Sequence, residues 1–187
     1  MKKIRWAILG AARVNEKLIP AITNSKQGEL VAIGSRRKNA AEECVKKYAQ
    51  EHIESIKCHT GFELILDNKE IDAIYIPLSN EEHTETALRA INNKKHVLIE
   101  KPMAIKSQEV QQLIDAAEKN NVRIMEGFMY AFHPQFDRIQ NIIQSNILGE
   151  LSYAHSMFSF PIQPARHYRI NRTIENGGGA LWDIGPY

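Results

Sequence analysis

The sequence has few cysteines, almost no net charge and no long apolar run. Its two cysteines, Cys44 and Cys58, do not form the C-x-x-C pattern of redox and metal sites, so no metal site is predicted. Small secreted proteins are often rich in disulfides, whereas this chain has only two cysteines without such a pattern. We therefore expect a reduced, cytoplasmic setting for the chain. The formal net charge of +2 over 187 residues gives no reason to expect nucleic acid or a membrane surface as a partner.

The chain also lacks the segments that target or anchor a protein. No apolar run approaches the roughly 20 residues of a membrane-spanning helix. The first residues, 1–6, lead directly into a predicted strand, so we expect no signal sequence. The composition, 43% apolar and 25% charged, is typical of a globular protein, and the length allows one domain and part of a second.

The most informative stretch is residues 97–102. Val97 to Glu100 form a short apolar run that ends on a charge, which predicts the end of a buried strand. Lys101 precedes Pro102 and is therefore biased away from helical geometry, so we expect a sharp turn and consider a cis Lys101–Pro102 bond. Ligands of open α/β sheets bind beyond the carboxyl ends of the strands. We predict that Lys101 meets a ligand there, although an isolated lysine in a loop is more often merely solvated.

Strand and helix patterns alternate over the first 125 residues. Strands are predicted at residues 6–10, 30–34, 59–60, 71–76, 96–100 and 122–125, and helices follow most of them, for example at 39–48 and 80–92 and after a predicted cap at Ser107. This alternation indicates an α/β fold with a parallel, doubly wound sheet. We therefore expect residues 1–125 to form one domain.

The turn after the first strand matches the dinucleotide-binding fingerprint only in part. In G-x-G-x-x-G, the first glycine is present as Gly10, while Ala12 and Asn15 replace the other two. A helix that begins here would present free N–H groups and the positive end of its dipole to phosphate. The predicted phosphate-binding residues are Gly10, Ala11, Ala12, Arg13 and Val14. A plain strand-to-helix turn is an equally good interpretation of this motif alone.

The end of the second strand indicates which dinucleotide is preferred. NAD-binding chains carry an Asp or Glu there for the ribose hydroxyls, whereas this chain has Ser35, Arg36 and Arg37. Arginine binds phosphate through two parallel hydrogen bonds, which suits the 2′-phosphate of NADP. We favour NADP, with NAD possible. The alternative is a solvated basic start to the next helix.

A helix start follows the fourth predicted strand. Pro77 closes that strand, and Ser79 with Glu82 forms a capping box that predicts a helix over residues 80–92. His83 lies in the first turn of this helix, near the same edge of the sheet. A lone histidine there is more often a packed or capping residue than a ligand contact, and both roles stay open.

The last third changes character. We expect an aromatic crossover at 128–134, a helix that ends near Gly149, a long strand at 151–160 and a loop at 161–176. Three glycines, 177–179, allow the backbone to approach a ligand or another segment closely. Asp183 and Tyr187 are four residues apart and would share a face of a helix.

Together these pieces resemble the Gfo/Idh/MocA oxidoreductases. The resemblance rests on the Gly10-Ala11-Ala12 turn, on Pro77 with Asn80 and His83, on the triplet Glu100-Lys101-Pro102, and on the ending Gly-Gly-Gly-Ala-Leu-x-Asp-x-Gly-x-Tyr. It covers essentially the whole chain. Most members have histidine where this chain has Tyr187. The tyrosine makes the chain more similar to the branch of dihydrodiol dehydrogenase, xylose dehydrogenase and glucose–fructose oxidoreductase.

The resemblance implies a fold and an activity. It implies a Rossmann domain at 1–125 and, at 126–187, the N-terminal part of an α+β substrate domain that members complete with a large, mostly antiparallel sheet. It implies hydride transfer between NAD(P) and a sugar, polyol or cyclic diol, in a homo-oligomer formed through the second domain. The alternative is a truncated, catalytically inactive NADP-binding regulatory or scaffold protein.

The resemblance also implies roles for individual residues. Tyr187 is the expected general acid/base, Lys101 its electrostatic partner and a donor to substrate, and Asp183 a residue that orients substrate. The expected cofactor contacts include the phosphate-binding turn and Ser35, Arg36 and Arg37. The resemblance implies further contacts from Pro77, Leu78, Asn80, His83, Glu100 and Lys101. Because the expected acid/base is the terminal residue, we expect the 187-residue chain to bind NADP but to oxidise sugars or diols hardly at all.

Overall fold

The computed structural model describes residues 2–185 and 187. Its internal contacts divide the chain into two compact units, Met1–Gly127 and Phe128–Tyr187. The division falls after residue 127, close to the predicted end of the first domain at residue 125. Among the described residues, no helix is long and apolar enough to cross a membrane.

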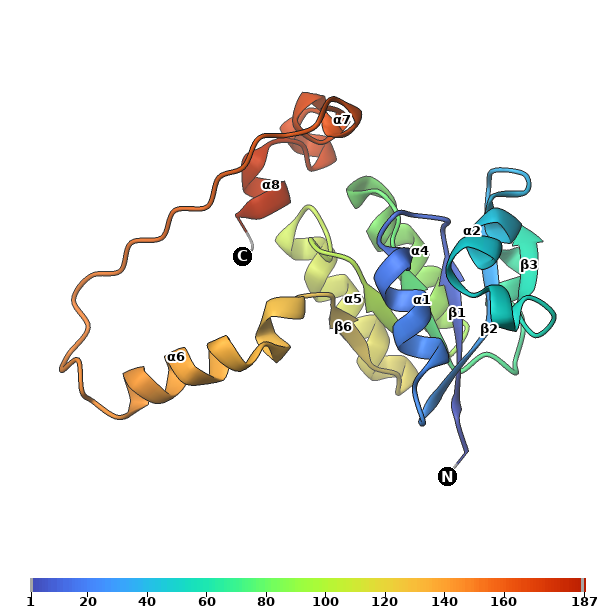
Figure 1. Ribbon diagram of the computed structural model, residues 1–187, viewed down its shortest axis with the longest axis horizontal. Coiled ribbons are helices and arrows are strands. Elements are labelled where there is room, and N and C mark those ends of the chain that lie inside the picture. Colours follow the sequence, from blue (N-terminus) through green and yellow to red (C-terminus); the bar gives the residue numbers. More distant parts are fainter. Residues whose placement is uncertain (1, 186) are drawn as a thin grey trace. The chain divides into compact units, whose positions relative to one another are not determined.

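The first unit is built on a sheet whose paired strands are all parallel (Figure 1). Its strands are β1 (Ile4–Leu9), β2 (Gly28–Ser35), β3 (Lys57–Thr60), β4 (Ala73–Ile76), β5 (His96–Ile99) and β6 (Ile124–Glu126). They lie in the order β3-β2-β1-β4-β5-β6. This order confirms the predicted doubly wound sheet.

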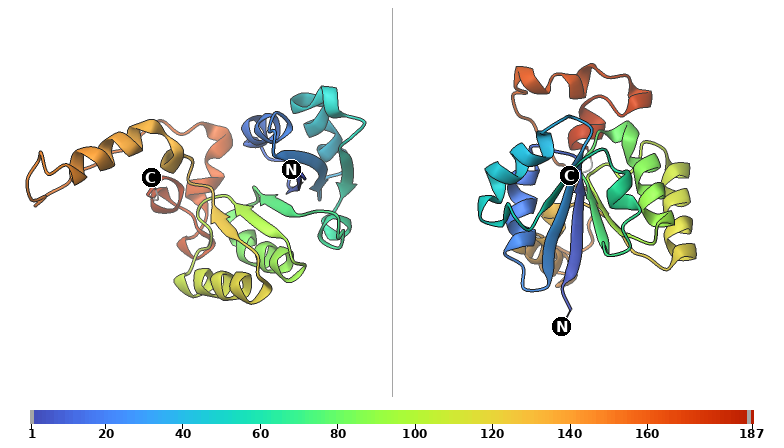
Figure 2. Two further views of the ribbon diagram at one scale, coloured as in Figure 1. Left: turned by 90° about the horizontal axis from the view of Figure 1, so that it is seen from below. Right: turned by 90° about the vertical axis from the view of Figure 1, so that its right-hand side faces the viewer.

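Helices cover both faces of this sheet (Figure 2). They are α1 (Asn15–Thr23), α2 (Ala40–Tyr48), α3 (Glu63–Leu66), α4 (Asn80–Asn92) and α5 (Ser107–Asn120), with a short 3₁₀ turn at Gln50–His52. Residues from α3, α4 and α5 share one core with Ile74 and Ile76, whereas residues from α1 and α2 share the other with Tyr75. Successive side chains of a strand point to opposite faces, so β4 contributes to both cores.

The order of the strands determines where a ligand can bind. The chain leaves β1 for α1 and β2 on one side, and leaves β4 for α4 and β5 on the other, so the order reverses between β1 and β4. In open α/β sheets the crevice for ligands lies at such a point, beyond the carboxyl ends of the strands. We call the ends of β1, β2, β4 and β5, with the residues that follow them, the carboxyl edge. The opposite ends form the amino edge.

Several boundaries in the first unit differ by one or two residues from the sequence prediction. The predicted cap Ser107 is the first residue of α5, and Lys106 stands at the cap position. Glu109 explains this start, because its carboxylate accepts hydrogen bonds from the N–H groups of Ile105 (3.2 Å) and Lys106 (3.1 Å). The strand predicted at 71–76 begins at Ala73. The Lys101–Pro102 peptide bond is cis, which is the conformation considered for it from the sequence.

The regular secondary structure described in the second unit consists of helices and 3₁₀ turns. It contains 3₁₀ turns at Met129–Phe132, Pro164–Arg166 and Ile174–Asn176 and the helices α6 (Pro134–Gln144), α7 (Tyr168–Asn171) and α8 (Ala180–Ile184). The helix predicted to end near Gly149 ends at Gln144. The predicted strand at 151–160 is wrong, since these residues have no regular structure. A strand needs a partner for its N–H and C=O groups, and the described part of this unit provides no strand that pairs with it.

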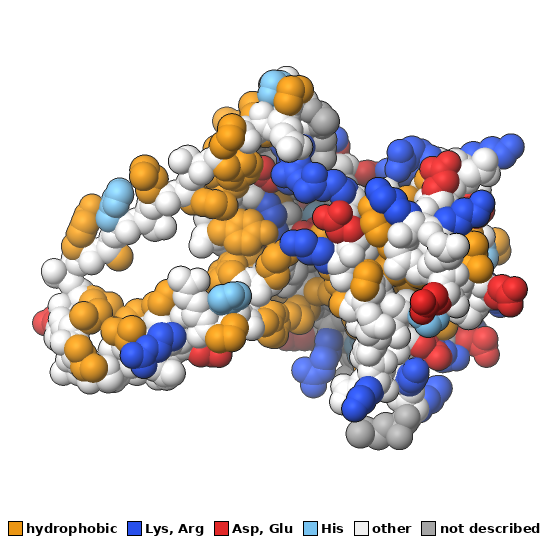
Figure 3. Space-filling view, in the orientation of Figure 1, with side chains coloured by type: hydrophobic (Ala, Val, Ile, Leu, Met, Phe, Trp, Pro, Cys, Tyr) orange, Lys and Arg blue, Asp and Glu red, His pale blue; other side chains and the backbone are white. Residues whose placement is uncertain are grey.

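Apolar side chains lie exposed along this irregular segment (Figure 3). They include Leu151, Tyr153, Met157 and Phe158, which are between 53% and 84% exposed. Exposed apolar side chains in such a run usually mark a surface that another segment covers. This observation agrees with the expectation that 126–187 is the beginning of a larger domain, which stays a proposal.

A partly buried ion pair at the amino edge of the sheet joins Arg5 of β1 to Asp72, the residue before β4. The backbone N–H, Nε and Nη2 of Arg5 donate to the carboxylate of Asp72 at 2.9, 3.1 and 3.0 Å. The hydrogen bond from the Arg5 side chain outweighs the opposing effect of burial and lowers the pKa of Asp72 to about 2.

This pair makes stability depend on pH in a defined window. The pKa of Asp72 is lower in the folded state than the usual ~3.9 of an unfolded chain, so its contribution is present above pH ~4 and is lost as pH falls towards ~2. We expect Asp72→Asn to reduce the free energy of unfolding at pH 7 by roughly 1 kcal/mol, since the pair is partly exposed. Denaturant titrations should show this difference shrinking between pH 5 and about pH 2. Glu70→Gln, which removes a carboxylate 3.9 Å from Arg5, is the control and should change little. A difference that persists unchanged at pH 2 would contradict this explanation.

Candidate functional site

The turn after β1 has a backbone that only glycine accommodates easily. Gly10 has φ of 134°, and a Cβ atom there would lie 3.0 Å from Cδ2 of Leu78. The N–H of Gly10 donates to the carbonyl of Gly34 at 2.8 Å. Asn15, at the first position of α1, is fully buried and donates from Nδ2 to the carbonyl of Gly10 at 2.8 Å. The residue in place of the third fingerprint glycine therefore holds the turn closed.

Asn15 also carries an unusual polar atom. Its Oδ1 is buried and has no hydrogen-bond partner among the described residues. A buried acceptor without a partner is costly and is rare away from functional or water-binding positions. The atom lies at the start of α1 and is an acceptor, so it calls for a donor such as a water molecule and not for a phosphate oxygen.

Arg37 joins the end of β2 to this turn. Its Nη2 donates to the carbonyl of Ala11 at 3.0 Å, and its backbone N–H donates to Oγ of the buried Ser35 at 3.2 Å. Ala11, Ala12, Arg13 and Val14 make up the turn itself, and α1 begins directly after them. The structure thus brings the predicted phosphate-binding turn close to Ser35 and Arg37, which are predicted to contact the ribose and its 2′-phosphate.

Arg36 lies beside the carboxylate of Glu82, which the sequence predicts only as part of a helix cap. Its Nη1 forms an ion pair with Glu82, which also accepts a hydrogen bond from Oγ of Ser79. The guanidinium lies 5.8 Å from the centre of the Phe62 ring. Burial raises the pKa of Glu82, but the hydrogen bonds from Arg36 and Ser79 outweigh it and the pKa is lowered. Glu82 would therefore compete with a bound phosphate for the guanidinium group of Arg36.

The loop after β4 contains Pro77, Leu78 and Asn80, and it adjoins the turn at Gly10. His83, in the first turn of α4, is 0% exposed. Its Nδ1 lies 2.7 Å from the carbonyl oxygen of Pro102 and its Nε2 lies 3.1 Å from that of Leu78. Both ring nitrogens thus face carbonyl oxygens of the protein, which favours the packed role over a direct contact with cofactor.

The turn after β5, residues Glu100–Met103, holds Lys101, and we call it the Lys101 turn. Oε1 of Glu100 accepts a hydrogen bond of 2.7 Å from the hydroxyl of Tyr75, a buried residue of β4. Burial and the neighbouring Glu100 raise the pKa of Tyr75, so its phenol stays a donor. Met103 donates its N–H to Oε1 of Glu126 at 2.7 Å. Sequence reasoning missed Tyr75 and Glu126 because neither belongs to a recognisable motif.

In the second unit the predicted residues Asp183 and Tyr187 have different surroundings. Asp183 lies in α8 and accepts a 2.7 Å hydrogen bond from Nη1 of Arg169. Tyr187 lies beyond the end of α8, so the predicted shared helical face is wrong. Its ring packs at 5.8 Å from Tyr130 and at about 6.5 Å from Phe128 and Phe158, measured between ring centres.

The glycine run approaches another segment of the same unit. A Cβ atom on Gly178 would lie 2.1 Å from the carbonyl oxygen of Arg172, a distance that no side chain allows. The N–H of Gly178 donates to Thr173 and that of Gly179 donates to Arg169, both at 3.0 Å. The close backbone approach predicted for these glycines is therefore present, and it is made to the protein.

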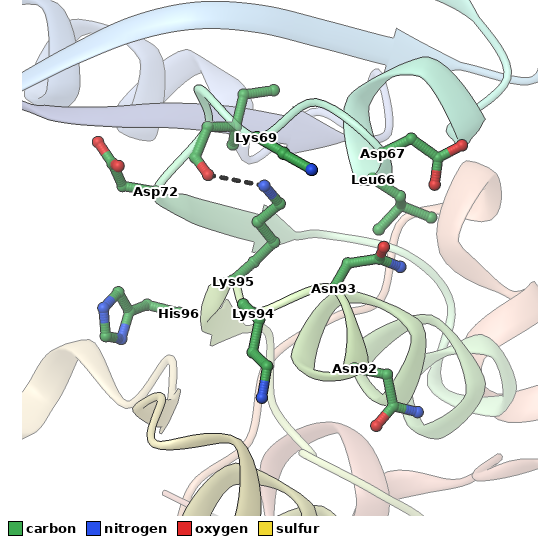
Figure 4. Close-up of a pocket in the computed structure, with 10 residues that line it drawn as sticks. Leu66, Asp67, Lys69, Asp72, Asn92, Asn93, Lys94, Lys95 and His96 are labelled. Atoms are coloured by element: carbon green, nitrogen blue, oxygen red, sulfur yellow. Dashed lines mark hydrogen bonds between the residues drawn. The ribbon is translucent and has the colours of Figure 1, made fainter.

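Within the first unit, a cavity of about 420 Å³ lies at the amino edge of the sheet, at the opposite ends of the strands from the Lys101 turn (Figure 4). Lys95 lies in it with 4% of its surface exposed and donates from Nζ to the carbonyls of Asn68 and Ile71. Burial lowers the pKa of this lysine. The ammonium group is satisfied by the backbone, so we assign Lys95 to the closure of the amino edge.

The carboxyl edge fits a phosphorylated dinucleotide. It combines a turn that requires glycine, the start of a helix, and a hydroxyl with two guanidinium groups at the end of β2. A doubly wound sheet with such an edge defines the class of dinucleotide-binding α/β domains. Residues 4–128 match the family model of the Gfo/Idh/MocA oxidoreductases, described as an oxidoreductase family with an NAD-binding Rossmann fold. The chain belongs to this family.

Similar proteins include sugar reductases and diol dehydrogenases. The chain is 31% identical over 185 residues to the dTDP-3,4-didehydro-2,6-dideoxy-alpha-D-glucose 3-reductase of Actinomadura kijaniata, covering 98% of this chain and 53% of the reductase. It is 32% identical over 187 residues to the trans-1,2-dihydrobenzene-1,2-diol dehydrogenase of Xenopus laevis, covering 98% of this chain and 54% of that enzyme. The chain thus spans about half the length of these relatives.

A solved structure supports the same assignment. A 3-ketoreductase from Actinomadura kijaniata, in complex with TDP-benzene and NADP, matches with a TM-score of 0.88 and 29% identity, covering 100% of this chain and 55% of the reductase. That structure carries a tyrosine-to-phenylalanine substitution. Further structures of the same reductase carry a lysine replaced by alanine or by glutamate.

Proposed function

We propose that this chain is the cofactor-binding part of an NADP-dependent oxidoreductase that transfers a hydride between the nicotinamide and a hydroxyl-bearing carbon of a sugar, polyol or cyclic diol. The observation that carries the proposal is the position of Lys101, in a turn fixed on both sides beyond β5 at the carboxyl edge of a family-typical sheet. The relatives named above are reductases and dehydrogenases, which supports a catalytic role over a purely regulatory one.

The preference for NADP rests on the residues after β2. Arg36 and Arg37 follow Ser35 where NAD-binding chains have an acid. The complexes of the related 3-ketoreductase contain NADP, which supports the same choice. Gly10 to Val14 would hold the pyrophosphate against the start of α1.

Lys101, Tyr187 and Asp183 would carry the proton chemistry. The bound nicotinamide supplies or accepts the hydride. The phenol of Tyr187 would take the hydroxyl proton of the substrate or return it to a carbonyl, and a neighbouring ammonium favours its charged form. Asp183, held by Arg169, would orient a substrate hydroxyl. One lysine and one tyrosine were also altered in the solved structures of the related reductase, which is consistent with these roles.

Two measurements test the proposal. Titration of the 187-residue chain with NADPH and NADH, followed by nicotinamide fluorescence, should show saturable binding with a preference for NADPH. A protein that carries this chain together with the further half that the relatives have should form NADPH from NADP⁺ with one or more aldoses or cyclic diols. Failure to bind either dinucleotide would contradict the cofactor site, and binding without any turnover across such a screen would contradict the proposed reaction.

A further inference from the structure

The backbone around Lys101 is held by side chains from three other elements. The carbonyl of Pro102 lies 2.7 Å from Nδ1 of His83 in α4, and the N–H of Met103 donates to Glu126 in β6 at 2.7 Å. On the other side of Lys101, the side chain of Glu100 is held by Tyr75. The partners thus act on the residues beside Lys101, within the first unit.

His83 lies between two loops of the carboxyl edge. Its ring lies between the carbonyls of Pro102 and Leu78, which follow the neighbouring strands β5 and β4. It is completely buried, and burial lowers its pKa, so at neutral pH the ring is uncharged and donates one hydrogen bond. The shorter contact, to Pro102, is the better position for that bond.

Glu126 performs a similar task from the other side. Its carboxylate accepts the N–H of Met103, a backbone donor in a turn with no strand to pair with. A charged acceptor makes a stronger hydrogen bond than a neutral one. Removing it would leave a partly buried N–H without its acceptor, so the turn would shift to satisfy it.

We propose that His83 and Glu126 are positioning residues, which fix Lys101 at the carboxyl edge by holding the carbonyl of Pro102 and the N–H of Met103. The proposal rests on the function proposed above, in which Lys101 takes part in the proton chemistry of the reaction, and it adds that Lys101 lies at the nicotinamide end of the cofactor. It assigns to His83 an indirect role, and it gives Glu126, which no motif identifies, a part in the same site.

The test is a double-mutant cycle on cofactor binding by the 187-residue chain. We measure the dissociation constants of NADPH and of adenosine 2′,5′-bisphosphate, which lacks the nicotinamide half, for the wild type, His83→Leu, Lys101→Met and the double variant. We expect each single change to weaken NADPH by about threefold to tenfold, as the loss of one hydrogen bond does, and to leave the bisphosphate within about twofold. Because His83 acts through Lys101, the double variant should be no weaker than Lys101→Met alone.

A second arm and a control keep the result interpretable. Glu126→Leu should behave as His83→Leu does, and Glu126→Gln, which keeps an acceptor oxygen, should recover most of the affinity. If His83→Leu does not fold, as judged by circular dichroism, His83→Gln and the Glu126 variants carry the test. Lys95→Met removes a comparably buried polar side chain at the amino edge and should change neither ligand's affinity.

Each remaining outcome overturns a specific statement. Additive effects in the double variant, or equal weakening of both ligands, would show that His83 does not act through Lys101 and would overturn the inference. No effect of His83→Leu and Glu126→Leu on NADPH would do the same. If Lys101→Met leaves NADPH binding unchanged, the placement of Lys101 in the proposed function is wrong, and the inference fails with it.

Discussion

Replacing Tyr187 by phenylalanine is expected to lower turnover by about 10²–10⁴-fold, the usual contribution of a positioned proton donor or acceptor. The assay is NADPH formation by a protein that carries this chain and the further half present in the relatives. The affinity for NADPH should stay within about twofold of the wild type, because the hydroxyl acts on the substrate and its contribution appears in the transition state. A loss confined to KM would instead indicate a binding role.

The packing of Tyr187 makes this substitution a clean one. Its ring contacts those of Tyr130, Phe128 and Phe158, and phenylalanine retains all of these ring contacts. Tyr130→Phe is the matched control, since it removes a hydroxyl from the same group of rings. We expect it to keep nearly full activity. If both variants lose turnover equally, the packing of the rings, and not the hydroxyl of Tyr187, supports activity.

The sheet was predictable because its signals are local. Successive residues such as Ala7, Ile8 and Leu9 point to opposite faces of the sheet and are all apolar, which indicates a strand that is covered on both faces. The helix over Asn80–Asn92 was predicted with correct bounds because Ser79 and Glu82 signal its start within one turn. Such patterns need no knowledge of distant residues, and they were enough to place the carboxyl edge and Lys101.

The contacts within the candidate site were not predictable in this way. Tyr75 and Glu100 are 25 residues apart, and His83 and Pro102 are 19 apart, so each pair meets only after the strands have aligned. The ion pair of Arg36 with Glu82 likewise joins β2's end to α4. The error at residues 151–160 has the same origin, since an alternating sequence forms a strand only beside another strand. Local pattern thus determines elements, while their partners depend on the assembled fold.

Replacing Arg36 by alanine is expected to weaken NADP binding by about tenfold to a hundredfold, as the loss of a charge-assisted hydrogen bond to phosphate does. NAD binding should change by less than about threefold, because NAD lacks the 2′-phosphate that the guanidinium would contact. Fluorescence titration with the two reduced dinucleotides measures both constants. Lys38→Ala, which removes an exposed positive charge two residues further on, is the control and should affect the two cofactors little and alike.

Glu82 makes the interpretation of this experiment sharper. In Arg36→Ala the carboxylate of Glu82 loses its ion-pair partner and would repel a 2′-phosphate, so the single substitution combines a lost attraction with a new repulsion. Glu82→Gln in the Arg36→Ala background removes that repulsion and should recover part of the NADP affinity. Glu82→Gln alone should strengthen NADP binding, because Arg36 no longer shares its charge with a carboxylate. Equal losses for NADP and NAD in Arg36→Ala would show that Arg36 does not recognise the 2′-phosphate, and the selectivity would then have to come from Ser35 and Arg37.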